Sequence, residues 1–144
     1  MLGVTVVTRK GPFMIDKDLF LKLGFQVVNS VKPDFDLLVK KFDEHSKNPD
    51  FRQGFSDNLS KYKEGLYVIR SPQCPYTEKN VNAILKSAEN KFNLKPNLID
   101  LQDSKAVQEM PCPFGSFCII YNGEIISYHP ISNTRFENIM KKRL

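Results

Sequence analysis

The 144-residue sequence lacks the features that mark secreted and membrane proteins. Its three cysteines are an odd number, which argues against a disulfide scaffold and suits a reducing compartment. It has no apolar run near the roughly 20 residues that are needed to cross a bilayer. Residues 1–9 lack the basic region that precedes the apolar run of a signal peptide. We therefore expect a cytoplasmic globular protein without a membrane partner.

The chain also lacks a dense basic patch, although its formal net charge is +5. The one tight basic cluster, residues 141–143, ends a predicted helix, where cations interact favourably with the helix dipole. We therefore expect no nucleic-acid partner. We expect no metal site either, because Cys112 and Cys118 are separated by five residues and no pair of histidines accompanies them.

Cys74 lies in the most informative segment of the sequence. Residues 66–70 before it are rich in β-branched and aromatic side chains and predict a buried strand. Apolar residues from Val81 to Phe92, three and four positions apart, predict an amphipathic helix after it. Pro75 fits the first helical position, so Cys74 faces the positive end of the helix dipole, which stabilises a thiolate. Cys74 is therefore a candidate reactive thiolate, and the alternative is a helix-capping cysteine without reactivity.

The first third of the chain predicts a small sheet with one helix. Residues 3–8 and 25–28 predict strands, and residues 35–39 predict a strand that is antiparallel to its predecessor. Asp16 is expected to cap the helix, and Gly24 is expected to end it.

The C-terminal part predicts the pattern βαβ–α–ββ–α, in which Asn122-Gly123 is a strong hairpin signal. The expected strands are 66–70, 97–101, 117–121 and 124–128, and the expected helices are 76–92, 105–110 and 133–142. This order is typical of a thioredoxin-like domain with a right-handed crossover. The predicted fold class is α/β, with a partial sheet over 1–45, a polar linker over 46–64 and the thioredoxin-like domain over 65–144.

Two groups of residues carry a family resemblance. In the C-terminal part they are Ser-Pro-Gln-Cys-Pro-Tyr at 71–76, the loop 111–115, residues 117–123 and His129. These resemble the YoaP-like domain, a thioredoxin-like module at the C-terminus of certain acetyltransferases of the GNAT superfamily. Residues 3–8 and the Leu-Phe-Leu-Lys-Leu-Gly-Phe sequence at 19–25 resemble the last third of the GNAT fold.

The sequence departs from these relatives at functional positions. GNAT enzymes hold the acyl-CoA pyrophosphate on a glycine-rich turn before a helix, but this chain has no Gly-x-Gly segment. The tyrosine that often acts as general acid is matched by Phe20, which has no proton to donate. Thr77 occupies the position of the second cysteine of a Cys-x-x-Cys motif, which excludes disulfide exchange within such a pair.

The resemblance also bears on the other candidate site residues. Cys112 lies in the loop that faces the helix start in this fold, so it is a candidate resolving thiol for Cys74, and the alternative is an ordinary loop cysteine. Cys118 is expected in the core. His129 is either a base or a satisfied or surface histidine. The resemblance leaves open whether Pro113 forms a cis peptide.

Three functions follow as expectations. The first is an accessory or C-terminal portion of a GNAT N-acyltransferase, which implies acetyl-CoA for the parent family but no cofactor bound by this chain alone. The second is a monothiol, glutaredoxin-like redox activity through Cys74, and the third is a thioredoxin-like protein-interaction module. Whether the chain alone is an enzyme stays open. We expect it to associate with itself or with a chain that supplies the missing GNAT half.

Overall fold

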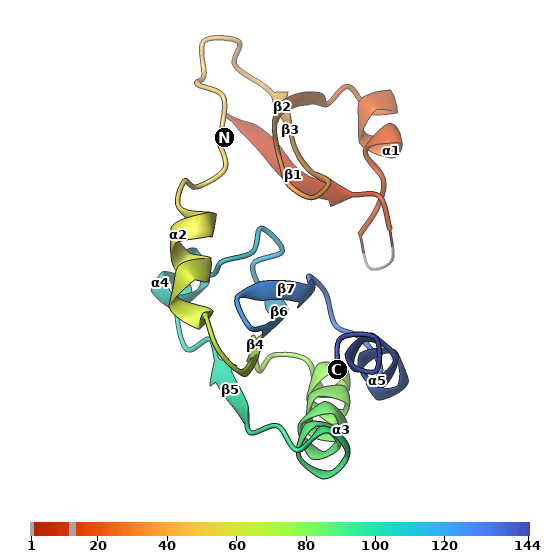
Figure 1. Cartoon of the computed structure of the whole chain (residues 1–144). Helices are drawn as coiled ribbons and strands as arrows, with labels where there is room; N and C mark the ends of the chain where they lie inside the picture. The colour runs from red at the N-terminus through yellow and green to blue at the C-terminus, as the bar shows by residue number, and fades with distance from the viewer. Residues whose placement is uncertain (1, 12–13) are drawn as a thin grey trace. The chain divides into compact units, whose positions relative to one another are not determined.

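The computed structural model describes residues 2–11 and 14–144, and the chain divides into two compact units (Figure 1). Unit 1 is Met1–Gln53 and unit 2 is Gly54–Leu144. Each unit combines a sheet with helices, so the predicted α/β class is confirmed. Within the described residues, no helix has the length and apolarity that crossing a membrane requires.

Unit 1 contains a three-stranded antiparallel sheet in which the last strand lies in the middle, in the order β1-β3-β2. Its elements are β1 (Gly3–Arg9), α1 (Lys17–Lys22), β2 (Gln26–Val31) and β3 (Phe35–Lys41). The predicted antiparallel pairing of the last two strands is confirmed. The sequence pattern predicted that the second strand ends at Val28, but its pairing with β3 continues to Val31, which lies opposite Phe35.

Local sequence signals bound α1 as expected. Asp16 caps the helix by accepting a hydrogen bond from the N–H of Asp18 at 3.2 Å. Gly24 follows the helix with φ at +83°, a conformation that glycine adopts without strain.

Unit 2 contains a four-stranded mixed sheet in the order β5-β4-β6-β7. Its elements are α2 (Phe55–Leu59), the 3-10 helix η1 (Ser60–Tyr62), β4 (Leu66–Arg70), α3 (Pro75–Phe92), β5 (Pro96–Asp100), α4 (Ser104–Gln108), β6 (Phe117–Tyr121), β7 (Glu124–Ser127) and α5 (Asn133–Met140). Strands β4 and β5 are parallel, whereas β6 is antiparallel to both β4 and β7. From β4 onward, this is the predicted order of strands and helices.

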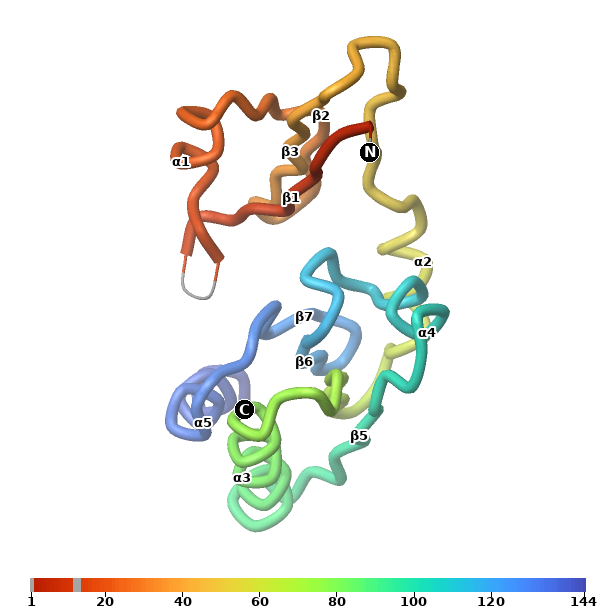
Figure 2. The backbone as a smooth tube through the Cα atoms, turned by 180° about the vertical axis from the view of Figure 1, so that it is seen from behind, coloured from red at the N-terminus to blue at the C-terminus, as the bar shows by residue number. Residues whose placement is uncertain are grey.

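The two faces of this sheet carry separate cores. Helices α3 and α5 cover one face, where Leu66 and Val68 of β4 contact the buried sides of both helices. The cartoon and the backbone tube both show these helices side by side (Figures 1 and 2). The opposite face packs Ile69 of β4 and Ile120 of β6 against residues of α4 and the loop after it. Alternation along β4 and β6 therefore supplies a core on each side of the sheet.

The predicted linker segment contains regular structure that its polar sequence did not indicate. Both α2 and η1 lie in it. Leu59 and Tyr62 pack against the core that contains Ile69, and the rings of Tyr62 and Tyr67 meet edge to face at 5.0 Å. These contacts attach η1 to unit 2 and explain why the compact unit begins at Gly54.

Within the part of the chain that the structure describes, the one cis peptide is Lys32-Pro33. It lies in the turn between β2 and β3. The peptide bond before Pro113, which the sequence left open, is therefore trans.

Candidate functional site

Cys74 lies directly before α3, at the end of the loop that follows β4. It is the N-cap residue of the helix, with extended backbone angles, and Pro75 opens the first turn. Its side chain is exposed. The thiol is therefore accessible at the start of an 18-residue helix, whose dipole favours negative charge at this end.

Thr77 is the main residue that stabilises a Cys74 thiolate. Sγ accepts no capping hydrogen bond of standard geometry. Nevertheless, the N–H and hydroxyl of Thr77, together with the N–H of Tyr76, lower the pKa of Cys74 by interacting with the charged sulfur. Thr77 itself is buried, so its hydroxyl is held in position. Thr77, which stands where a dithiol motif has its second cysteine, thus promotes ionisation of Cys74.

A small pocket adjoins this thiol, with a volume of about 140 Å³. Its lining residues are Ser71, Gln73, Cys74, Thr77, Ser116, Phe117 and Pro130.

Cys112 and Cys118 lie in the core on the sheet face opposite to α3. Both are buried, and none of the three cysteines forms a disulfide. A hydrogen bond with Cys112 and burial together raise the pKa of Cys118 well above its ordinary value. The Cys112 thiol also lies 3.6 Å from the carbonyl oxygen of Phe117, a residue that lines the pocket beside Cys74. Cys112 itself does not line that pocket, and a bridge to Cys74 stays a prediction.

His129, considered above as a base, is buried near the end of the hairpin. Its carbonyl oxygen accepts a 2.7 Å hydrogen bond from Ser127. It is not among the residues that line the pocket of Cys74.

Unit 1 contains a larger pocket that the sequence did not predict, with a volume of about 560 Å³. We call it the Asp36 pocket. Its lining residues are Thr8, Lys10, Asp16, Lys17, Asp18, Ser30, Val31, Lys32, Pro33, Asp34, Phe35 and Asp36. They come from the end of β1, the start of α1 and the β2–β3 hairpin.

Cross-strand pairing places three polar residues in one row at the base of this pocket. Asp36 of β3 lies opposite Thr8 of β1 on one side and opposite Ser30 of β2 on the other. Directly opposed side chains point to the same face of a sheet. The three residues therefore share a face, which is also the face that α1 approaches through Lys17.

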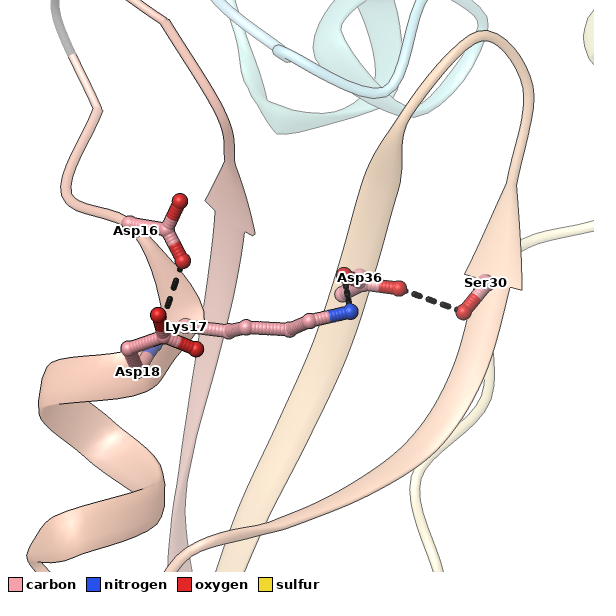
Figure 3. Close-up of polar contacts among 5 residues, drawn as sticks. All are labelled: Asp16, Lys17, Asp18, Ser30 and Asp36. Atoms are coloured by element: carbon pink, nitrogen blue, oxygen red, sulfur yellow. Dashed lines mark hydrogen bonds and ion pairs between the residues drawn. The ribbon is translucent and has the colours of Figure 1, made fainter.

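Asp36 is the centre of the polar contacts (Figure 3). Lys17 Nζ donates to its Oδ2 at 2.9 Å, and Ser30 Oγ donates to its Oδ1 at 2.6 Å. Partial burial alone would raise the pKa of Asp36, but the hydrogen bonds from Ser30 and Lys17 lower it overall. The same hydrogen bond raises the pKa of Lys17. The pair is therefore ionised at neutral pH.

The signal for this pocket was present in the sequence but indirect. Thr8, Ser30 and Asp36 are polar residues within the strands β1, β2 and β3, which also contain other polar residues such as Thr5 and Asn29. Their proximity depends on the insertion of β3 between β1 and β2, which periodicity does not reveal.

The chain is similar to a known family and to a curated protein. The YoaP-like family matches residues 97–138, a segment that includes Cys112 and His129 but not Cys74. The uncharacterized N-acetyltransferase YoaP of Bacillus subtilis (strain 168) is 23% identical over 133 residues, which are 92% of this chain and 52% of that protein. The chain thus spans about half the length of this relative. No solved structure matches the chain significantly. These matches support an acetyltransferase-like family.

Proposed function

We propose that this chain is an accessory or C-terminal portion of a GNAT-family N-acyltransferase, in which the parent enzyme transfers an acyl group from acyl-CoA to an amine. The observation that carries the proposal is the similarity to a protein named N-acetyltransferase over 133 residues, which is most of both units. The YoaP-like match within unit 2 supports the same family. In this proposal unit 1 is the last part of the GNAT sheet and unit 2 is a thioredoxin-like domain.

Two features of unit 1 support an accessory role rather than independent catalysis. The connection from β1 to α1 contains a single glycine, Gly11, and not the glycine-rich turn that would hold a pyrophosphate. Phe20 packs its ring edge to face against Phe25 at 5.4 Å and has no proton to donate to a leaving thiolate. In this proposal the half of the enzyme that binds acetyl-CoA lies outside this chain.

Titration calorimetry of the chain with acetyl-CoA tests this proposal. We expect no binding in the micromolar range. The Cys74→Ser variant is the control, because a reaction between CoA and the exposed thiol would release heat without a cofactor site. A micromolar dissociation constant that persists in this variant would contradict the proposal.

We also propose a partner and a compartment on the same basis. Strands β1 and β2 are the two edges of the unit 1 sheet, and each pairs with β3 on one side within the described residues. Such edges pair readily with another strand. The proposed partner is a second copy of the chain, or a chain that supplies the missing GNAT half. Three cysteines without disulfides, one of them exposed, suit the cytoplasm.

A second candidate function is a monothiol redox activity of Cys74. The observation that favours it is the lowered pKa of this exposed thiol beside Thr77. The thiolate would attack a substrate disulfide, forming a mixed disulfide and releasing the other sulfur as a thiolate. An external thiol such as glutathione would then attack the mixed disulfide and regenerate Cys74.

A further inference from the structure

We propose that the Asp36 pocket of unit 1 binds a small zwitterion, a molecule that carries both an ammonium and a carboxylate group. The proposal rests on the geometry of unit 1 alone. It requires neither acyl transfer nor a reactive Cys74.

The first observation is the hydroxyl of Thr8 in the pocket wall. Thr8 is 1% exposed, and its Oγ1 makes no hydrogen bond to any described residue. A buried hydroxyl without a partner costs free energy, and the great majority of buried polar atoms have one. Because Thr8 lies opposite Asp36 and lines the pocket, a ligand bound against Asp36 would supply the missing partner.

The second observation is the unused accepting capacity of Asp36. A carboxylate can accept about four hydrogen bonds. Lys17 and Ser30 each donate to a different oxygen of Asp36. An ammonium group has three donors, enough to serve both this carboxylate and the Thr8 hydroxyl. Lys17 shows that an ammonium is accommodated beside this carboxylate, and its own side chain is 43% exposed.

The third observation concerns the rim. Lys10 and Lys32 are exposed, line the pocket, and make no ion pair with any residue in the described ranges. Asp34, by contrast, is paired with Arg9 at 2.7 Å. The two lysines would hold the carboxylate of a ligand whose ammonium is at Asp36.

The charges and size of the pocket define the ligand class. Four aspartates line it, which disfavours a nucleotide or another polyanion. Its volume of about 560 Å³ is in the range of small-molecule sites, roughly 300–1,000 Å³. Groups of both signs favour a zwitterion over a simple cation or anion.

Three probes of similar length separate these classes: 4-aminobutyrate carries both charges, butylamine carries the ammonium alone, and butyrate carries the carboxylate alone. Each is titrated into the full-length chain at millimolar concentrations while amide resonances are followed by NMR. We expect 4-aminobutyrate to shift resonances of β1, α1 and the β2–β3 turn, with an affinity about tenfold or more above either single-charge probe. No shift in these elements, or equal affinity for butylamine or butyrate, would overturn the proposal.

The Thr8→Val variant tests the role of the hydroxyl, with Thr5→Val as its matched control. Thr5 is on the same strand but opposite Val39, on the other face of the sheet. We expect Thr8→Val to weaken 4-aminobutyrate binding about three- to tenfold and Thr5→Val to leave it unchanged. Thr8→Val should not lower the melting temperature, because the hydroxyl has no partner in the unliganded protein. Unchanged binding in Thr8→Val, or a clear loss of stability, would contradict the proposal.

Binding of acetyl-CoA is measured in a separate experiment. The proposed accessory role and the proposed zwitterion site can therefore fail independently of each other.

Discussion

Single residues determine the chemistry that unit 2 can carry out, and Thr77 has the largest effect. Thr77 lies three residues after Cys74, at the position that a second cysteine occupies in dithiol oxidoreductases, and its N–H and hydroxyl lower the pKa of Cys74. A side chain that cannot form a disulfide can still stabilise a thiolate. The lowered pKa of Cys74 supports the proposed redox activity, in which an external thiol resolves the mixed disulfide.

Alkylation of the three cysteines tests this effect. Because its pKa is lowered, Cys74 is more ionised at neutral pH than a free cysteine, and it should react faster than the buried Cys112 and Cys118. Thr77→Val removes the hydroxyl but keeps the backbone N–H, so the pKa should rise and the rate at neutral pH should fall roughly two- to fivefold. Thr77→Ser should retain most of the rate. The measurement is the alkylation rate against pH, with peptide mass spectrometry to identify each cysteine.

The redox hypothesis for Cys74 would fail if its rate profile matched that of an unstructured cysteine peptide, or if Thr77→Val had no effect. Mild oxidation in the presence of glutathione adds a second readout. A Cys74–glutathione adduct would indicate an external resolving thiol, whereas a Cys74–Cys112 bridge would require the buried Cys112 to become accessible.

Among the secondary-structure elements, α3 and α5 are linked by a carboxylate in addition to their shared apolar core. Oε1 of Glu137 in α5 accepts hydrogen bonds from Lys91 at 2.8 Å and Ser87 at 3.0 Å, both in α3, and from Asn133 at 2.8 Å. The contacts from Lys91 and Ser87, with a smaller effect of Asn133, lower the pKa of Glu137. Its ionised form therefore stabilises the packing of the two helices.

We predict that Glu137→Gln lowers the melting temperature of unit 2 at neutral pH by a few degrees. The pKa is lowered on folding, so this stabilisation is present above the ordinary value of 4.5 and is lost as the pH falls through the folded-state pKa. The difference between variant and wild type should therefore shrink below that pH. Circular dichroism melting curves across this range provide the measurement.

Glu124→Gln is the control for this prediction. Glu124 forms an ion pair with Arg143 at 2.6 Å, but its side chain is 65% exposed, and exposed pairs contribute little. We expect a smaller change for this variant. Equal melting temperatures for Glu137→Gln and wild type at neutral pH, or a difference that persists in acid, would show that the network does not stabilise the helix pair.

For the whole molecule, the decisive property is the small size of unit 1. One six-residue helix is too short to cover both faces of a three-stranded sheet. The sheet also has two edge strands, β1 and β2, whose outer sides are not paired within the described residues. Several large apolar side chains of this unit remain exposed: Leu2, Val4, Ile15, Leu19, Leu21, Leu23, Val27 and Phe42. Exposure of this kind is typical of a surface that another chain covers.

We therefore predict that the chain self-associates or binds the proposed missing half. Light scattering of the isolated chain should give a mass above that of one 16.6 kDa chain. Val27→Lys, which places a charge on the edge strand β2, should reduce this mass. Val107→Lys is the matched control, because Val107 is similarly exposed but lies in α4 of unit 2. A monomer with a protease-resistant N-terminal unit would contradict the prediction.

The sequence by itself determined the features that depend on neighbouring residues. Asn122 and Gly123 predicted a tight hairpin, and their positive φ angles of 48° and 80° confirm it. Asp16 and Gly24 marked the ends of α1. The position of Cys74 before α3 also followed from local patterns. A predicted strand precedes Cys74, and a proline and the apolar residues of an amphipathic helix follow it directly.

Only the tertiary structure decided which distant residues meet. The row of Thr8, Asp36 and Ser30 exists because β3 lies between β1 and β2, and a shift of one residue in this pairing would turn Asp36 to the other face. The contact between Cys112 and Cys118 likewise depends on how a loop folds back on β6. Local periodicity contains no information on strand order or register, since these are selected by packing across the whole unit. The position of Cys74 before α3 could therefore be predicted from the sequence, whereas the Asp36 pocket could not.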